Sequence, residues 1–196
     1  MADQLKICNM ALSYLGISPL IVLDSTTVEG PKILNAWDVV LDEVLAEHPW
    51  RFATKRSALA QLATSPVGGW LYAYQINSDC VFPIEATTST FDDDVLLETD
   101  IYWAQEGNTL VCNEEENVFL KYTSRTIEPG YFSAGFVSAL SARLAAELAL
   151  ILSEKPTALF KAMYELYQMR LSRAKAQDNL SQNIDPGLEN QWIDAR

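Results

Sequence analysis

The chain has 196 residues, of which 26 are acidic and 14 are basic, and its formal net charge at pH 7 is −12. This sign disfavours a non-specific nucleic-acid binder, which needs positive charge to neutralise phosphates. Apolar residues make up 49% of the chain and include 5 Trp, 8 Tyr and 7 Phe, which excludes a disordered composition and is enough for a sizeable core.

The first part of the chain predicts two helices. Apolar residues recur at helical spacing over residues 5–15, and Gly16 follows as a natural stop. A second apolar stripe covers residues 33–45, with Pro31 at a position that a first helical turn tolerates. Pro49 ends this helix, because the residue before a proline is pushed out of the helical region.

From about residue 58 to residue 126 the pattern changes to the period of two that is typical of strands. Residues 70–76 alternate in this way. Glu106-Gly107-Asn108 separates residues 101–104 from residues 109–112, which predicts a hairpin turn. We therefore expect four to six short antiparallel strands in this region.

Residues 131–178 predict helices again. An apolar stripe covers residues 136–151, and alanines fill most of the remaining positions, so we expect a helix that is buried on several sides. Pro156 begins a fourth helix, whose apolar face covers residues 160–171. Residues 179–196 contain a Pro-Gly pair and several amides, which is typical of an extended arm.

Together these patterns predict an α+β fold, built as a four-helix bundle with an inserted antiparallel β region and an extended C-terminal arm. We expect a single domain over residues 1–178, with helices at about 3–48 and 131–178 and the β insert at about 58–126. The arm then occupies residues 179–196.

The lack of a recognisable targeting signal and the spacing of the cysteines indicate a cytoplasmic setting. The N-terminal Met-Ala-Asp-Gln has no basic segment followed by an apolar run, so we expect no signal peptide. An arginine and a glutamate interrupt the longest apolar stretch, residues 136–152, which argues against a membrane span. Cys8, Cys80 and Cys112 are odd in number and far apart, which predicts neither a zinc site nor a disulfide framework.

Few residues suggest catalysis. His48 stands beside Glu47, which could orient it as a general base, but no nucleophile motif accompanies it and a helix cap is the ordinary interpretation. Asp92–Asp94 and Glu114–Glu116 resemble the carboxylates of metal-dependent enzymes only in composition, because three consecutive acids cannot converge on one ion. We therefore predict solvated loops, no metal, no cofactor and no enzymatic activity.

Other residues are candidates for contacts between subunits. Arg143 and Glu147 lie four positions apart, which favours an intrahelical pair slightly over a subunit contact. Arg170 and Arg173 lie toward the end of the fourth helix, where the helix dipole favours positive charge. The predicted arm carries four large apolar residues, Ile184, Leu188, Trp192 and Ile193. Large apolar side chains on a flexible segment suggest that the segment folds when it binds a partner.

Two tryptophans are predicted to pack at the junction between the bundle and the β region. Trp50 follows Pro49, so its ring can fold back beneath the second helix. Trp70 begins an alternating strand and shares a face with Tyr72 and Tyr74. Large aromatic side chains bury the most surface, so we expect each truncation to alanine to cost about 3–5 kcal/mol.

Four segments share a pattern with a known family. They are residues 7–20 (ICNMALSYLGISPL), 43–53 (EVLAEHPWRFA), 69–81 (GWLYAYQINSDCV) and 136–152 (FVSALSARLAAELALIL). The residues that carry the likeness are Asn9, Leu12, Leu15, Gly16, Pro49, Trp50, Phe52, Trp70, Tyr72, Tyr74 and Asp79. In this order and spacing, from residue 5 to about residue 178, they resemble the tail tubular protein A family of short-tailed bacteriophages. Asn77 departs from the pattern, because a proline is expected before Ser78-Asp79.

The resemblance implies a structural protein of the virion, made in the host cytoplasm and located at the head-tail junction. Members of this family form a ring of twelve copies below the portal protein, extend the DNA channel, and offer a docking surface to the nozzle, tail tubular protein B. No cofactor or membrane is involved, and DNA passes without specific binding. Two alternatives remain: another head-completion or stopper protein of a phage, and a metal-dependent enzyme that uses the acidic clusters.

Overall fold

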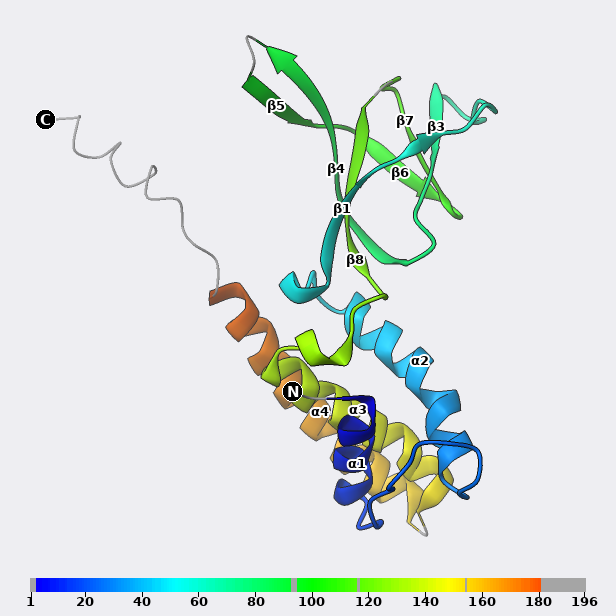
Figure 1. Cartoon of the computed structure of the whole chain (residues 1–196), viewed down its shortest axis with the longest axis vertical. Helices are drawn as coiled ribbons and strands as arrows, with labels where there is room; N and C mark the ends of the chain where they lie inside the picture. The colour runs from blue at the N-terminus through cyan, green and yellow to red at the C-terminus, as the bar shows by residue number, and fades with distance from the viewer. Residues whose placement is uncertain (1–2, 93–94, 116, 154, 181–196) are drawn as a thin grey trace, which may run out of the picture.

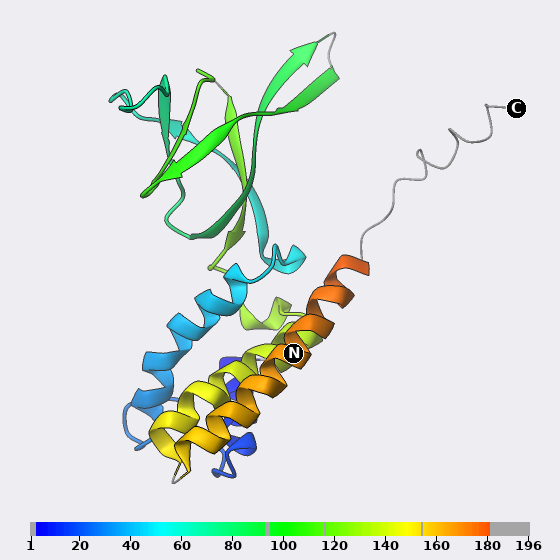
Figure 2. The same cartoon turned by 180° about the vertical axis from the view of Figure 1, so that it is seen from behind.

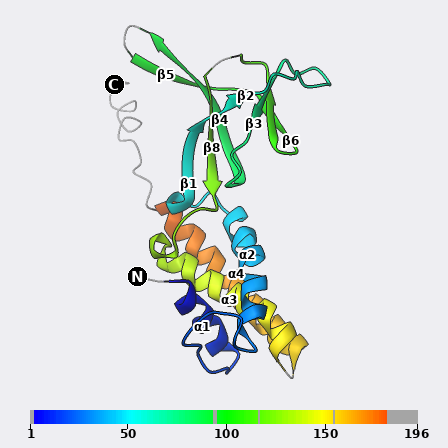
Figure 3. The same cartoon turned by 45° about the vertical axis from the view of Figure 1, so that its right-hand side comes forward.

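A computed structural model describes residues 3–92, 95–115, 117–153 and 155–180. It shows an α+β fold with four helices and two four-stranded antiparallel sheets (Figure 1). The helices gather at one end of the molecule and the strands at the other, as the views from behind and from the side also show (Figure 2 and Figure 3). We refer to these two ends as the helical part and the β part.

Two of the four helices, the first and the third, begin at a side-chain cap. The four are α1 (Gln4–Tyr14), α2 (Gly30–Ala46), α3 (Ala134–Leu152) and α4 (Pro156–Leu180). The Asp3 carboxylate accepts a hydrogen bond of 2.7 Å from the Lys6 N–H, and the Ser133 hydroxyl accepts one of 3.2 Å from the Phe136 N–H. These side chains satisfy N–H groups that the first helical turn leaves without partners.

Helix α3 is the centre of the helical part, because α1, α2 and α4 each pack on it. The predicted four-helix bundle is therefore wrong: strands separate the helices in the chain, and α1, α2 and α4 each pack on α3. An apolar stripe shows that a helix is packed, but it does not show which helix it packs on. The buried alanines along α3 let its three neighbours approach closely.

By length and composition alone, α3 is also apolar enough to cross a membrane. Ten of its residues are buried, and most of these belong to the core of the helical part. Packing within the helical part therefore accounts for its apolar character.

The strands form two sheets. One has the order β1 (Thr54–Ala58), β8 (Val118–Ser124), β4 (Cys80–Asp92) and β5 (Val95–Asp100). The other has the order β2 (Ala60–Gln61), β3 (Tyr72–Gln75), β7 (Thr109–Cys112) and β6 (Trp103–Glu106). Side chains of both sheets meet in a second core, which is separate from the helical core and includes Tyr74, Leu110, Leu120 and Tyr122.

The β part is larger than the sequence pattern predicts, with eight strands in the described residues and a first strand at Thr54. The hairpin at Gly107 is confirmed: β6 and β7 pair in antiparallel fashion, and Gly107 has a φ of +62°. Strand β4 pairs with β8 in a register that shifts between Cys80 and Phe82 and between Pro83 and Glu85. Such irregularities bend a strand locally.

The two tryptophans have different environments. Trp50 lies just before the short 3-10 turn η1 (Arg51–Ala53) and is fully buried in the helical core. Trp70 is only partly buried and belongs to neither of the two cores, so its predicted place in the packed junction is wrong. A period-two pattern shows which face a residue occupies, but it does not show whether that face is covered at the end of a strand.

Gly30, the first residue of α2, is expected to tolerate no side chain. A Cβ added there would overlap the backbone carbonyl oxygen of Asp24 and come within 2.7 Å of the Thr27 hydroxyl oxygen. Relief requires movement of the loop before α2, so Gly30→Ala is expected to lower the free energy of unfolding by about 1–3 kcal/mol. Urea denaturation measures this, with Asn35→Ala on the same helix as the control. Equal midpoints for both variants would contradict the close contact.

Candidate interaction surfaces

His48 pairs with an acid that the sequence did not suggest. Its Nε2 lies 3.1 Å from Oδ2 of Asp178, and the two side chains are only 12% and 9% exposed. Glu47, the neighbour that could have oriented His48, instead forms an ion pair of 2.9 Å with Lys175. The acid beside His48 is Asp178, which the end of α4 places there from 130 residues away.

A cavity of about 600 Å³ adjoins this pair, between η1, the first sheet and the end of α4. The Arg51 N–H also donates to Asp178, at 3.3 Å, so the carboxylate joins α4 to the chain that follows α2. One hydroxyl lines the cavity, that of Thr54, and it donates to the Trp50 carbonyl at 2.8 Å. In the part of the chain that the structure describes, these contacts make a joint between elements and supply no activated nucleophile.

The acidic clusters fall partly outside the described residues. Asp93, Asp94 and Glu116 belong to that undescribed portion, and nothing is inferred for them. Glu114 and Glu115 are exposed. Within the described ranges, no three or more His, Cys, Asp or Glu side chains are arranged to hold a metal ion. The structure thus supplies no support for metal-dependent chemistry at the residues that it places.

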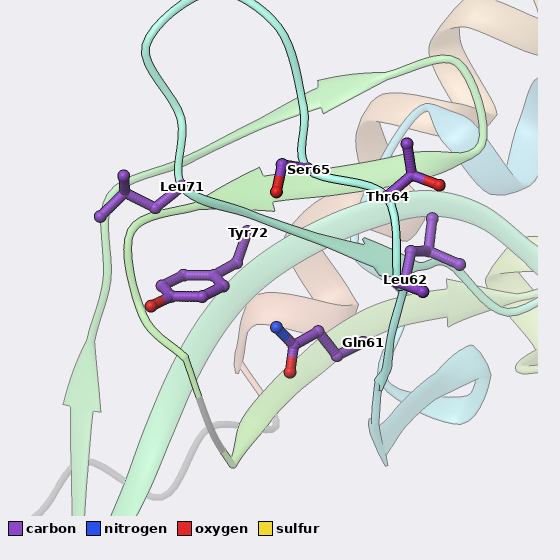
Figure 4. A pocket seen from close by; sticks show the side chains of 7 residues that line it. Gln61, Leu62, Thr64, Ser65, Leu71 and Tyr72 are labelled. Carbon is purple, nitrogen blue, oxygen red and sulfur yellow. The ribbon is translucent and has the colours of Figure 1, made fainter.

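A smaller cavity of about 340 Å³ lies under the loop between β2 and β3 (Figure 4). The ring of Tyr72 and the amide of Gln61 lie on one side of it, and Ser65 and Thr64 lie on the loop above. Its lining residues are Gln61, Leu62, Ala63, Thr64, Ser65, Leu71 and Tyr72, none of them charged at neutral pH. This lining provides polar contacts but no acid, base or cation for chemistry.

Arg143 forms the pair that the sequence predicts and a second pair that it does not. Its Nη1 lies 3.0 Å from Glu147 on the same helix, which confirms the intrahelical interpretation. Its Nε and Nη2 also bind both carboxylate oxygens of Glu43 on α2, at 2.9 and 2.8 Å. Burial lowers the pKa of Arg143, but these hydrogen bonds outweigh it and hold the pKa above its usual value. The guanidinium is thus committed to joining α2 and α3.

The two arginines of α4 differ from each other. Arg170 donates to the Tyr14 hydroxyl at 2.7 Å and to the Ser138 carbonyl at 3.2 Å, and it lies over the Tyr14 ring. It therefore connects α1, α3 and α4 within one chain. Arg173 is exposed, in a groove between α3 and α4. The remaining candidates, Ile184, Leu188, Trp192 and Ile193, lie outside the described residues.

Asp79 is the centre of a polar cluster in the turn before β4. Its carboxylate accepts hydrogen bonds from Lys55 (3.0 Å), Ser124 (2.7 Å), Thr126 (3.0 Å) and Tyr122 (3.0 Å). Burial raises the pKa of Asp79, but these four donors outweigh it and hold the pKa well below the usual range. Spacing alone could not reveal this cluster, since its members are 24 to 47 residues from Asp79.

No family model matches the chain, and no curated protein matches it either. The site must therefore be judged from its geometry. Among the described residues, the charged groups that the sequence singled out hold elements together or remain exposed in a groove.

Proposed function

We propose that the chain is a structural ring subunit of a short-tailed bacteriophage, an adaptor that joins the portal protein to the tail nozzle. The observation that carries this proposal is the place of the residues that resemble the tail tubular protein A family. Several of them form the joints that the fold depends on: the Asn9 amide binds both the N–H and the carbonyl of Leu20, at 2.8 and 2.9 Å. Trp50 and Asp79 anchor the passage from helices to strands.

The departure at Asn77 leaves this framework intact. The Cys80 N–H donates to the Asn77 carbonyl at 3.0 Å, which closes the turn before β4 without a proline. The Asn77 side chain also accepts a hydrogen bond of 2.9 Å from the Ser57 hydroxyl. The turn thus positions Asp79 by hydrogen bonds.

The shape and charge of the chain also support the proposal. A helical part and a β part at opposite ends give a subunit two separate regions, one for its neighbours in a ring and one for the next tail component (Figure 1). The net charge of −12 repels DNA. Such repulsion suits a channel through which DNA must pass without adhering. We assign the ring wall to the helical part, and the contacts with the nozzle to the β part. Of the predicted arm, Asn179 and Leu180 belong to α4, and residues 181–196 lie outside the described residues. Contact of the arm with the portal or a neighbour stays a prediction.

Loss of the protein is expected to block attachment of the tail and leave heads without nozzles. Phage that lacks the gene should yield DNA-filled or leaking heads, and supplying the intact gene should restore complete particles. Supplying His48→Ala should restore infectivity as well, since no catalysis is assigned to that residue.

Cryo-electron microscopy of purified particles tests the location: density for this chain directly below the portal is expected. Density elsewhere in the head, or its absence from the virion, would refute the adaptor.

A further inference from the structure

Apolar packing of α4 stops more than one turn before the end of the helix. Its buried side chains are Tyr167, Leu171 and Ala174, which belong to the helical core. The two apolar residues beyond them, Ala176 and Leu180, are exposed, and Leu180 is 84% exposed. The last described turn of α4 is therefore not held by burial of apolar surface.

Polar contacts hold this end of the helix instead. Nε2 of His48 lies 3.1 Å from Oδ2 of Asp178, and the Arg51 N–H donates to the same oxygen at 3.3 Å. About one turn earlier, Lys175 pairs with Glu47 at 2.9 Å. These contacts place the end of α4 against the chain between α2 and β1 (Figure 3). We call the contact of His48 with Asp178 the terminal pair.

The two members of the terminal pair are anchored unequally. The His48 ring packs edge-on against Trp50, with ring centroids 4.9 Å apart, and the Trp50 N–H donates to the His48 carbonyl at 2.7 Å. Trp50 is fully buried in the helical core, so it holds His48 in place. Asp178 lies on the turn that lacks apolar anchors, beside the cavity of about 600 Å³. This cavity gives the carboxylate room to move away without displacing a core side chain.

The helix itself disfavours an acid at this position. The last carbonyls of a helix carry partial negative charge, so they repel a carboxylate in the last turn and favour a cation there. Asp178 lies two residues before Leu180, where α4 ends. On its own the carboxylate therefore weakens the turn. Its contact with His48 and the hydrogen bond from the Arg51 N–H offset that repulsion.

We infer that the terminal pair is a latch on the end of α4. When the latch is closed, it holds the last turn against the chain between α2 and β1. When it opens, that turn is released alone, because the buried side chains as far as Ala174 keep the rest of α4 in the helical core. The chain continues from Leu180 directly beyond the pair, so the latch fixes where the chain leaves the helical part. This inference does not depend on the proposed adaptor function.

Hydrogen exchange of the full chain tests the latch, read by mass spectrometry on peptides from the last turn of α4. Asp178→Ala and His48→Ala are each expected to speed exchange there about tenfold or more, because each removes a hydrogen bond to a charged acceptor. His48→Gln retains a donor in place of Nε2 and should exchange nearly as slowly as the unaltered chain. Asn179→Ala, an exposed position on the same turn, is the matched control and should leave exchange unchanged.

The direction and the extent of the change distinguish a latch from an ordinary helix end. Without a latch, Asp178→Ala removes only the repulsion from the last carbonyls and should slow exchange. Slowed or unchanged exchange in that variant would therefore overturn the inference. Peptides from α3 should exchange alike in every variant. Faster exchange there in His48→Ala would show that His48 supports the whole helical core, which would also overturn a local latch. The location of the chain in the virion, which tests the adaptor, is independent of each of these results.

Discussion

Replacing Trp50 with alanine is expected to cause the largest loss of stability of any single substitution considered. The side chain is completely buried, and its ring packs edge-on against Phe136, with ring centroids 5.0 Å apart. Its indole N–H donates to the Val44 carbonyl at 2.9 Å, near the end of α2, where carbonyls lack helical partners. Alanine removes the packing and leaves a cavity, which together cost about 3–5 kcal/mol.

Urea denaturation followed by circular dichroism measures this effect, and Trp50→Phe divides it into its two causes. Phenylalanine retains most of the packed volume and loses the indole donor, so its loss should be well below that of alanine. Trp70→Ala is the matched control, since Trp70 is only partly buried and belongs to neither core. If Trp50→Ala and Trp70→Ala unfold at the same urea concentration, the burial of Trp50 does not make the expected contribution to the free energy of unfolding.

Periodicity predicted each element of the helical part but not its arrangement. The stripes over residues 5–15 and 33–45 correspond to α1 and α2, because one buried face repeats every 3.6 residues. The predicted bundle failed because the buried residues of α3 spread over several of its sides, so its sequence does not show which neighbour packs on which side. Helix spans are thus a local property, whereas the central place of α3 depends on the whole chain.

The contacts of the candidate residues also divide into those that sequence spacing predicts and those that depend on the tertiary structure. The pair of Arg143 and Glu147 was predictable because both lie four positions apart on one helix. The bond of Arg143 to Glu43 spans 100 residues, and that of His48 to Asp178 spans 130. Only the packing of α2 and α4 brings those acids near. A sequence pattern reveals a charged residue in an apolar helix, but the partner that makes its burial tolerable comes from the tertiary structure.

Replacing Asp79 with alanine is expected to loosen the start of the β part. The carboxylate accepts from Lys55 on β1 and from Tyr122 and Ser124 on β8, so it ties the turn before β4 to two strands. Its loss removes the acceptor that these donors share, although Lys55 keeps its hydrogen bond of 2.7 Å to the Thr126 hydroxyl. Removal of one partner of a buried pair costs several kcal/mol, but Lys55 is 38% exposed and partly solvated, so we expect about 2–3 kcal/mol.

The contribution of Asp79 should also depend on pH in a defined direction. Burial raises the pKa of Asp79, but its four hydrogen bonds hold the folded-state pKa far below the unfolded value of about 3.9. The unfolded chain therefore binds this proton first as the pH falls. Stability from Asp79 is fully present above about pH 4–5 and is lost as the pH falls from there through the folded-state pKa.

Asp79→Asn isolates this term, because it keeps the size of the side chain and removes the titration. The difference in free energy of unfolding between the unaltered chain and Asp79→Asn should stay constant from neutral pH to about pH 5 and shrink below about pH 4. Denaturation series at each pH measure it, with Asp38→Asn, an exposed acid, as the control. A difference that is near zero at every pH would show that hydrogen bonds to the neutral amide hold the turn equally well. The carboxylate charge would then not be what joins the turn before β4 to β1 and β8.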